Sequence, residues 1–298
     1  MANLKEIRTR ITSVSSTRQI TSAMKMVSAA KLKKAQDTIL LMRPYAIKLQ
    51  EILANLSDSD KSSTDNPYGK NREPHNVLIV VVTSNRGLCG AFNSNVIKLS
   101  LQLANEKYKN QLSNKKLFFL PIGRKANDFF TKKGFQVVKG NYNHLLDAPT
   151  FEKTASEGQM IINLFIEGNY DRIEVVYNQF KNAGIQITTV EQFLPIAKIP
   201  EKKKDPQMKT VHNDFIFEPT KEEIIKELIP KSLKVQLYKA ILDSVASEHG
   251  ARMTSMHKAT DNATDLIKEL KLQYNKARQA SITNEILEIV AGAEALRG

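Results

Sequence analysis

The sequence predicts an α/β protein in which long N- and C-terminal helices form an antiparallel coiled coil and the residues between them form a compact domain. Apolar residues recur at steps of three and four near both ends of the chain, which is typical of helices that pair along a seam. Between residues 76 and 199 short apolar runs alternate with helical segments, which is typical of an α/β domain. We therefore expect a coiled-coil helix at 1–57, a linker at 58–75, the α/β domain at 76–199, a second linker at 200–218 and a coiled-coil helix at 219–298.

The N-terminal seam extends from Leu4 to Leu56, and a continuous helix of this length would measure roughly 80 Å at about 1.5 Å per residue. Pro44 is expected to bend it locally. A helix with so narrow an apolar seam needs a partner helix, which the C-terminal segment supplies. The apolar seam positions are Leu4, Ile7, Ile11, Val14, Leu32, Ala35, Ile39, Met42, Ala46, Leu49, Leu53 and Leu56, and one polar block interrupts them at Arg18, Thr21, Lys25 and Ser28.

The middle of the chain predicts a Rossmann-like domain. A polar stretch rich in turn formers, SDSDKSSTDNPYGKNREP, separates it from the first helix. Helical segments are expected near 94–110, 124–133 and 151–167. The four expected strands are 77–82, 117–122, 173–180 and 185–196. The short turn from Lys181 to Gly184 predicts that the last two strands form an antiparallel hairpin.

The first strand runs into a glycine loop, in the sequence VLIVVVTSNRGLCGAFN at 77–93. A strand, a glycine turn and a helix N-terminus form many nucleotide sites, because free N–H groups and the helix dipole face the anion. Neither the P-loop spacing nor the three-glycine dinucleotide spacing occurs here. We favour an ordinary strand-to-helix turn over a phosphate site.

The C-terminal segment predicts a helix of nearly eighty residues from about Pro219, with Pro230 as a strong breaker and Gly250 as a weak spot. Its last stretch, ILEIVAGAEAL at 286–296, is apolar over more surface than one neighbouring helix could cover. A dedicated socket is a better explanation of this apolar tip than self-association. The C-terminal seam consists of Leu233, Leu237, Ile241, Val245, Met253, Met256, Ala263, Ile267, Leu270, Tyr274 and Ala277.

Composition excludes several classes of protein. The longest apolar run has six residues, far short of the roughly 20 that a membrane-spanning helix requires, and the charged N-terminus does not resemble a secretory signal. Cys89 is the single cysteine, so no internal disulfide or paired-cysteine zinc site can form, and a reducing, cytoplasmic setting is expected. The net charge of +13 indicates an acidic partner. Residues 1–56 have ten basic and three acidic side chains but only Tyr45 as an aromatic residue, which does not fit a single-strand nucleic-acid binder.

Several motifs resemble the gamma subunit of F-type ATP synthases. The run YNKARQASITNEILEIVAGAEA is similar to the C-terminal signature of that family, and KEIRTRITSVSSTRQITSAMKMVSAAKLKKAQ is similar to its first helix. RPYA, TSNRGLCGAFN and ASEHGARMTSMHKATDNA resemble further landmarks in the same order. The resemblance extends over essentially the whole chain. Gly250 departs from it, because the family usually has a better helix former there.

The resemblance implies a non-catalytic rotor shaft that couples ion flow through the membrane sector to ATP synthesis or hydrolysis and regulates both. The implied partners are three alpha and three beta subunits, the epsilon subunit and the membrane c-ring, with no nucleic acid and no direct membrane insertion. It implies no cofactor, because the chemistry belongs to the beta subunits. The chain has no glycine-lysine phosphate loop, metal-spaced histidines or nucleophile elbow, so catalytic, cofactor-binding and metal-binding residues are not expected. A bacterial enzyme at the cytoplasmic face of the inner membrane is favoured, because a targeting extension and a paired-cysteine insert are missing.

Two groups of residues correspond to the coupling surfaces of the family. Met24 matches its coupling methionine, and Lys25 beside it is expected near acidic loops of the beta subunits; an interface role for the polar block is favoured over a packing defect. Arg252, Arg278, Gln279, Thr283 and Glu285 resemble the polar set that couples the upper shaft to alpha and beta, against the simpler interpretation of a solvated helix face. The alternative functions are a nucleotide-binding α/β enzyme and a basic coiled-coil nucleic-acid binder, which a bound ligand or salt-sensitive affinity would reveal.

Overall fold

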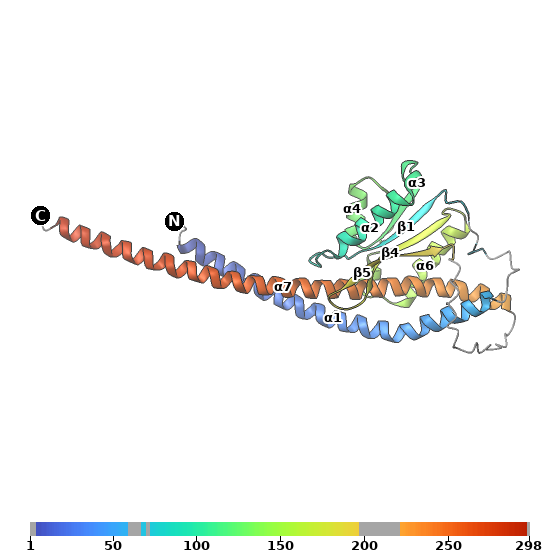
Figure 1. The fold of residues 1–298 in the computed structure, drawn as a ribbon, viewed down its shortest axis with the longest axis horizontal. Coiled ribbons are helices and arrows are strands. Elements are labelled where there is room, and N and C mark those ends of the chain that lie inside the picture. The colour runs from blue at the N-terminus through green and yellow to red at the C-terminus, as the bar shows by residue number, and fades with distance from the viewer. Residues whose placement is uncertain (1–3, 59–66, 70–71, 197–220, 297–298) are drawn as a thin grey trace, which may run out of the picture. The chain divides into compact units, whose positions relative to one another are not determined.

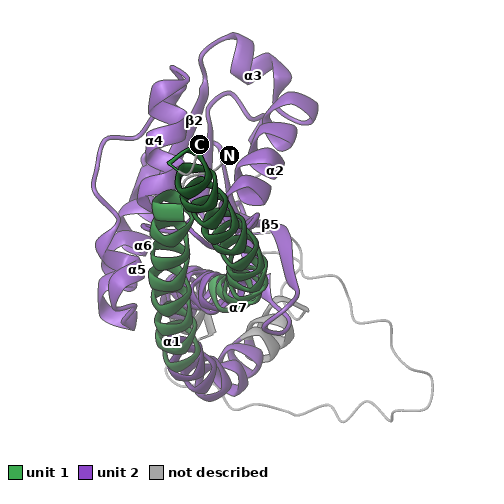
Figure 2. Ribbon diagram, turned by 90° about the vertical axis from the view of Figure 1, so that its left-hand side faces the viewer, with its two compact units in different colours: residues 1–30, 252–298 green, residues 31–251 purple. Residues whose placement is uncertain are grey.

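The computed structural model describes residues 4–58, 67–69, 72–196 and 221–296. These residues form two compact units: residues 1–30 with 252–298, and residues 31–251 (Figure 2). We call them unit 1 and unit 2 and describe each separately. The predicted linker at 200–218 and most of the linker at 58–75 lie outside the described residues, and the five predicted domain boundaries stay a prediction.

Figure 1 shows two long helices, α1 (Leu4–Asp58) and α7 (Lys221–Ala295). Both helices contribute to both units. Both helices continue through their internal prolines, Pro44 and Pro230. The prediction that Pro230 is a strong breaker is therefore wrong. Proline removes one helical hydrogen bond, but Ile229 and Leu233 on either side are buried at 6% and 4% exposure, and this packing offsets the loss.

In unit 1 the predicted seam is the contact face of the two helices. Every seam position of α1 from Leu4 to Ser28 is buried or half-buried, including those of the polar block. Opposite them, Met256, Ala263 and Leu270 of α7 are buried. The recurrence of seam positions at steps of three and four residues therefore predicted the buried side of each helix correctly. This holds even at the polar block, where the residue types alone would have predicted exposure.

In unit 2, α7 is enclosed far more completely than a two-helix seam requires. From Ala240 to Gly250 every residue is buried except His249, which is half-buried. The sheet contributes to this enclosure, because Ser247 donates a hydrogen bond to the backbone oxygen of Asn178 over 3.0 Å. The expectation of a narrow apolar stripe is wrong for this segment, since the α/β domain covers the sides of α7 that a coiled coil would leave in water.

The sheet of unit 2 has five strands in the order β3-β2-β1-β4-β5. The first four in this order are parallel, and β5 is antiparallel to β4, which confirms the Rossmann-like arrangement and the predicted hairpin. β1 is buried on both faces, as its continuous run of Val, Leu and Ile predicts for a central parallel strand. The strands are β1 (Val77–Val82), β2 (Leu117–Ile122), β3 (Gln136–Val137), β4 (Arg172–Phe180) and β5 (Gln186–Leu194).

Helices flank this sheet and complete its core. Phe119 of β2 stacks on Phe130 of α4, with ring centroids 4.1 Å apart. Val77, Ile79 and Val96 belong to the same buried cluster. The helices are α2 (Phe92–Glu106), α3 (Lys109–Ser113), α4 (Arg124–Lys132), α5 (His144–Asp147) and α6 (Phe151–Ile166). The short elements α3, α5 and β3 were not predicted, because two to five residues do not establish a hydrophobic period.

Gly250 is a point of close approach and not a weak spot. The helix is continuous through it, and a Cβ atom placed there would lie 3.0 Å from the backbone oxygen of Ala183, in the turn between β4 and β5. A missing side chain lets this turn contact α7 directly. Glycine at this position therefore has a packing reason within unit 2.

Candidate functional site

The apolar tip at the C-terminal end of α7 is exposed throughout. Each residue from Ile282 to Leu296 is exposed in the described part of the chain. Ile289 is 71% exposed, Leu287 61% and Ile286 55%. A soluble chain rarely leaves so many large apolar side chains in water on one short segment, so this surface is built to be covered.

Four of the predicted polar site residues lie just before the apolar tip at 286–296. Arg278, Gln279, Thr283 and Glu285 are all exposed. Thr283 Oγ1 donates to the backbone oxygen of Gln279 over 3.0 Å, which places these two residues one turn apart on the same side. Ser281 Oγ lies 3.4 Å from Glu285 Oε1 and donates to it. The structure thus brings these four residues onto one accessible stretch of helix.

Arg252 does not belong to this accessible stretch. It is buried, at 7% exposure, at the opposite end of the unit 1 segment of α7. The 26 positions between it and Arg278 correspond to about 39 Å of helix at about 1.5 Å per residue. The predicted polar set therefore separates into a buried arginine and a distant exposed group. Sequence order alone could not reveal this, because both lie on one continuous helix.

Met24 and Lys25 occupy half-buried positions on α1. Ile20 and Val27 are 60% and 57% exposed, and their spacing from Met24 by four and three residues places all three on one face. The sequence reasoning overlooked Ile20 and Val27. They could have been found as the large apolar residues that fall outside the seam. We call Ile20, Met24 and Val27 the α1 apolar strip.

The polar block has a partner inside unit 1. Thr21 is 8% exposed, and its hydroxyl lies 2.9 Å from the hydroxyl of Thr260 on α7. Ser28 is also buried, at 3% exposure. Part of the block therefore serves the contact between the two helices, and the proposed external role is left to Lys25 and its neighbours on the α1 apolar strip.

The glycine loop after β1 packs against the N-terminus of α4, the helix that follows β2. It satisfies the first N–H groups of α4 with its own oxygens: Asn85 Oδ1 accepts from Arg124, the Ser84 carbonyl from Lys125 and Thr83 Oγ1 from Ala126. Gly123 has φ 112°, and a Cβ there would lie 2.5 Å from the Thr83 carbonyl oxygen. The two loops are packed against each other too closely to admit a phosphate at the α4 N-terminus.

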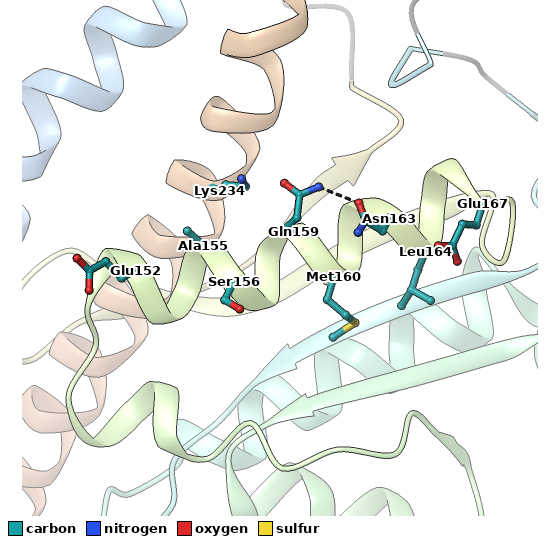
Figure 3. Close-up of a pocket in the computed structure, with 9 residues that line it drawn as sticks. All are labelled: Glu152, Ala155, Ser156, Gln159, Met160, Asn163, Leu164, Glu167 and Lys234. Carbon is teal, nitrogen blue, oxygen red and sulfur yellow. Dashed lines mark hydrogen bonds between the residues drawn. The ribbon is translucent and has the colours of Figure 1, made fainter.

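A groove of about 670 Å³ in unit 2 runs along α6 (Figure 3). Its polar wall includes Glu152 and Ser156 of α6 and Glu167 just after that helix, and Lys234 of α7 closes one side. Gln159 Nε2 donates to Asn163 Oδ1 over 2.8 Å, so these two amides satisfy each other. The groove is open and presents no nucleophile with an adjacent base.

Among the described residues there is no cluster of three metal-ligating side chains. In the same residues, no helix is long and apolar enough to cross a membrane.

Known proteins similar to this chain match it over nearly its whole length. The family described as ATP synthase matches residues 3–296. The ATP synthase gamma chain of Flavobacterium psychrophilum is 60% identical over 301 residues, and that of Flavobacterium johnsoniae is 58% identical over 298 residues, with 100% of each chain covered in both cases.

Solved rotor structures have the same fold. The rotor of the Euglena gracilis mitochondrial ATP synthase has a TM-score of 0.66 at 20% identity, covering 94% of this chain and 98% of that chain. The central stalk of the Tetrahymena thermophila mitochondrial ATP synthase has a TM-score of 0.56 at 24% identity, covering 80% and 99%. At these identities the likeness concerns the arrangement of helices and strands.

Proposed function

Because the chain belongs to the ATP synthase gamma chain family, we infer that it is the central shaft of an F-type ATP synthase, which couples ion flow to ATP synthesis and hydrolysis. It carries no catalytic role in this scheme. Its contribution is mechanical: rotation of an asymmetric helical shaft changes three neighbouring catalytic sites in turn. Residues 1–57 and 219–298 form the shaft, and residues 76–199 form the domain attached to it.

The observation that supports this proposal most directly is the exposed apolar tip of α7. Six large apolar side chains between Ile282 and Leu296 are at least 44% exposed. Burying them requires more surface than one neighbouring helix provides, because they are distributed over about half of the helix circumference. A ring of three alpha and three beta subunits provides such a socket.

The coupling surface begins on the α1 apolar strip. Met24 lies there beside Lys25, half-buried against its own unit and still accessible at its edge. An apolar surface can slide past a stator without forming fixed ion pairs, while Lys25 interacts with acidic stator loops at a distance. We assign the sliding contact to Met24 and the electrostatic contact to Lys25.

The upper coupling surface consists of Arg278, Gln279, Thr283 and Glu285, which point to alpha and beta. Both signs of charge are present and exposed, so this group can exchange partners as three similar subunits pass. Arg252 supports the same role indirectly. It is buried at 7% exposure in the chain by itself, and we propose that it acts by positioning α7.

The remaining partners follow from the family. The epsilon subunit and the membrane c-ring would contact the α/β end of the chain, which makes the protein peripheral at the cytoplasmic face of a bacterial inner membrane. The positive net charge of +13 suits an environment of acidic loops. The alternatives of a nucleotide-binding enzyme and a nucleic-acid binder receive no support from the packed glycine loop or the aromatic-poor first helix.

Hydrogen exchange tests the socket. Residues 282–296 should exchange rapidly in the isolated full chain and become protected when alpha and beta subunits are added, because the socket is then present. The buried strand β1 serves as the internal control and should be protected in both samples. Equal exchange of 282–296 with and without alpha and beta would contradict the proposal, as would strong protection in a proven monomer.

A further inference from the structure

Glu191 of β5 joins both strands of the β4–β5 hairpin to α7 within unit 2. Its Oε1 accepts a hydrogen bond of 2.5 Å from the hydroxyl of Tyr177 in β4, and Lys239 Nζ of α7 lies 3.5 Å from the same oxygen. Its Oε2 lies 3.4 Å from Gln236 Nε2 of α7, which donates to it. Gln236 Nε2 also lies 3.4 Å from the backbone oxygen of Gln192. One carboxylate therefore links β4, β5 and α7.

Tyr177 is a lasting donor to this carboxylate. It is fully buried, and burial together with the charge of Glu191 raises its pKa, so the phenol keeps its proton through the physiological pH range. The side chain of Glu191 is only 25% exposed, so water competes little for its oxygens. A hydrogen bond to a charged group is stronger than one between neutral groups, which makes this link a firm one.

Two further contacts of the hairpin lie along the same side of α7. Ser247 is completely buried and donates to the backbone oxygen of Asn178 in β4 over 3.0 Å. Asn178 is itself held in place, because its Nδ2 donates to the Phe92 carbonyl over 3.1 Å. Gly250 lies against the turn of the hairpin, where a Cβ atom would be 3.0 Å from the backbone oxygen of Ala183. The hairpin thus follows α7 from its start at β5 to its turn.

The α7 residues of these contacts lie on one line along the helix. Gln236, Lys239, Ser247 and Gly250 fall within a sector of about 80° around the axis at about 3.6 residues per turn, and they extend over about 21 Å at about 1.5 Å per residue. A helix held at one point can roll or tilt about that point. A helix held along such a line can do so only by breaking several contacts together. We call this set of contacts the hairpin contact.

We propose that the hairpin contact passes rotation between the α/β domain and α7, with Glu191 as a positioning residue that keeps helix and sheet at a fixed angle. This inference rests on the proposed function, because it requires that the chain turns as a shaft. α7 continues without a break from unit 2 into unit 1, so a torque applied at residues 236–250 travels along its backbone. Loosening the hairpin contact lets the domain turn ahead of the helix when the shaft works against a load.

Hydrogen exchange of the full chain tests whether these contacts hold α7. Tyr177→Phe combined with Ser247→Ala removes one donor to Glu191 and the donor to the β4 backbone. Exchange of residues 236–250 should become about tenfold faster or more, since a lost hydrogen bond to a charged group corresponds to about 1.4 kcal/mol or more. Both substitutions only delete a hydroxyl group, so the packing of the core is retained.

Tyr108→Phe combined with Ser100→Ala is the matched control. Tyr108 is a buried tyrosine that donates to the carboxyl group of Glu174 on the same sheet, and Ser100 is a buried serine that donates to the backbone oxygen of Val96. The control therefore loses the same two hydroxyl groups, but neither residue belongs to the hairpin contact. Exchange of residues 236–250 should match that of the parent.

Ion pumping by the assembled enzyme tests the transmission of rotation. Membrane vesicles that contain the whole ATP synthase with Tyr177→Phe and Ser247→Ala should hydrolyse ATP as the parent does. They should pump fewer ions per ATP against an opposing gradient, because the load acts on a loosened contact. The control pair Tyr108→Phe and Ser100→Ala should pump as the parent does under the same gradient.

The parent vesicles separate this inference from the proposed function. ATP hydrolysis without any pumping in the parent would contradict the shaft itself, whereas normal pumping there leaves the variants to decide on the hairpin contact. Unchanged exchange of residues 236–250 in the Tyr177→Phe and Ser247→Ala variant would overturn the inference. Faster exchange without a loss of pumping, or an equal loss of pumping in the control, would overturn it as well.

Discussion

At the scale of single residues, the chain distinguishes side chains that face outward for coupling from side chains that hold the shaft together. Met24 and Thr21 are close in sequence but differ in role: Thr21 is hydrogen-bonded to Thr260, whereas Met24 lies on a strip with exposed Ile20 and Val27. A substitution at one position should therefore affect coupling, and at the other the pairing of the helices.

Met24→Lys is expected to uncouple catalysis from ion transport more than it impairs assembly. The new lysine would form ion pairs with acidic stator loops at a position where the apolar surface of the shaft has to slide past the stator. Membrane vesicles of the variant would be assayed for ATP hydrolysis and for ion pumping, with hydrolysis persisting and pumping lost. Met24→Leu is the matched control and should pump normally. Unchanged coupling in Met24→Lys would show that Met24 has only a packing role.

Asp243→Asn is expected to stabilise the chain at neutral pH. The folded-state pKa of about 6 lies above the ordinary value of 3.8, so the folded chain holds this proton more tightly than the unfolded chain. Asp243 therefore makes stability fall as pH rises from about 4 to 6, by up to about 3 kcal/mol. The variant should gain about 1–3 kcal/mol at pH 7.5 and lose this component of the pH dependence. Denaturant unfolding at pH 5 and 7.5 measures it, and a variant less stable than its parent at pH 7.5 would contradict the expectation.

At the scale of elements, the closeness of the β4–β5 turn to α7 is the feature least visible in the sequence. Gly250 lies 67 positions from Ala183, and only the folded arrangement shows that their backbones nearly touch. A side chain there would separate the turn from the helix. This contact fixes the edge of the sheet to the helix.

Gly250→Val is expected to lower the free energy of unfolding by about 1–3 kcal/mol, because its added carbons would overlap the Ala183 carbonyl. Gly292→Val is the matched control on the same helix, since a Cβ there meets nothing within 4 Å. Denaturant unfolding compares the two. If both variants unfold at the same denaturant concentration as the parent, the turn does not constrain α7.

The glycine loop is expected to bind no nucleotide. Its oxygens already accept the first N–H groups of α4, and Arg86 is exposed beside them. Isothermal titration of the full chain with ATP, ADP and NAD should show no saturable heat at millimolar ligand, where a site of about 1 mM would be half filled. A stoichiometric site that Arg86→Ala abolishes would favour the enzyme alternative.

The sequence predicted the features that follow from a periodic or continuous apolar pattern, and it missed those that depend on residues distant in sequence. The seam spacing located the buried side of α1 and α7 through the polar block, and the run VLIVVV predicted a strand. The enclosure of residues 240–250 could not be predicted, because Asp243, Ser244, Ser247 and Glu248 resemble the solvated face of a helix. The burial of Arg252, one of the predicted coupling residues, could not be predicted for the same reason: burial of a charged side chain depends on what the rest of the fold brings to it.

At the scale of the whole molecule, the two units differ in what they leave exposed. Unit 2 has a complete core of sheet and helices, whereas unit 1 leaves the last fifteen described residues of the chain, 282–296, in water. A protein that works without partners would not keep so large an exposed apolar surface. The proposed shaft is therefore stable at one end on its own and depends on its surroundings at the other.

The hydrogen bond between Thr21 and Thr260 has a consequence for how an angle is transmitted. If α1 slipped by one heptad along α7, most apolar positions would again meet apolar positions, but Thr21 would face Met253 or Ile267 and lose its partner. The pair of helices therefore has a single preferred axial register, although its apolar repeat alone would tolerate several. A torsional load on one helix is then transmitted to the other without slippage between them. Each rotation angle at one end of unit 1 therefore corresponds to one rotation angle at the other end.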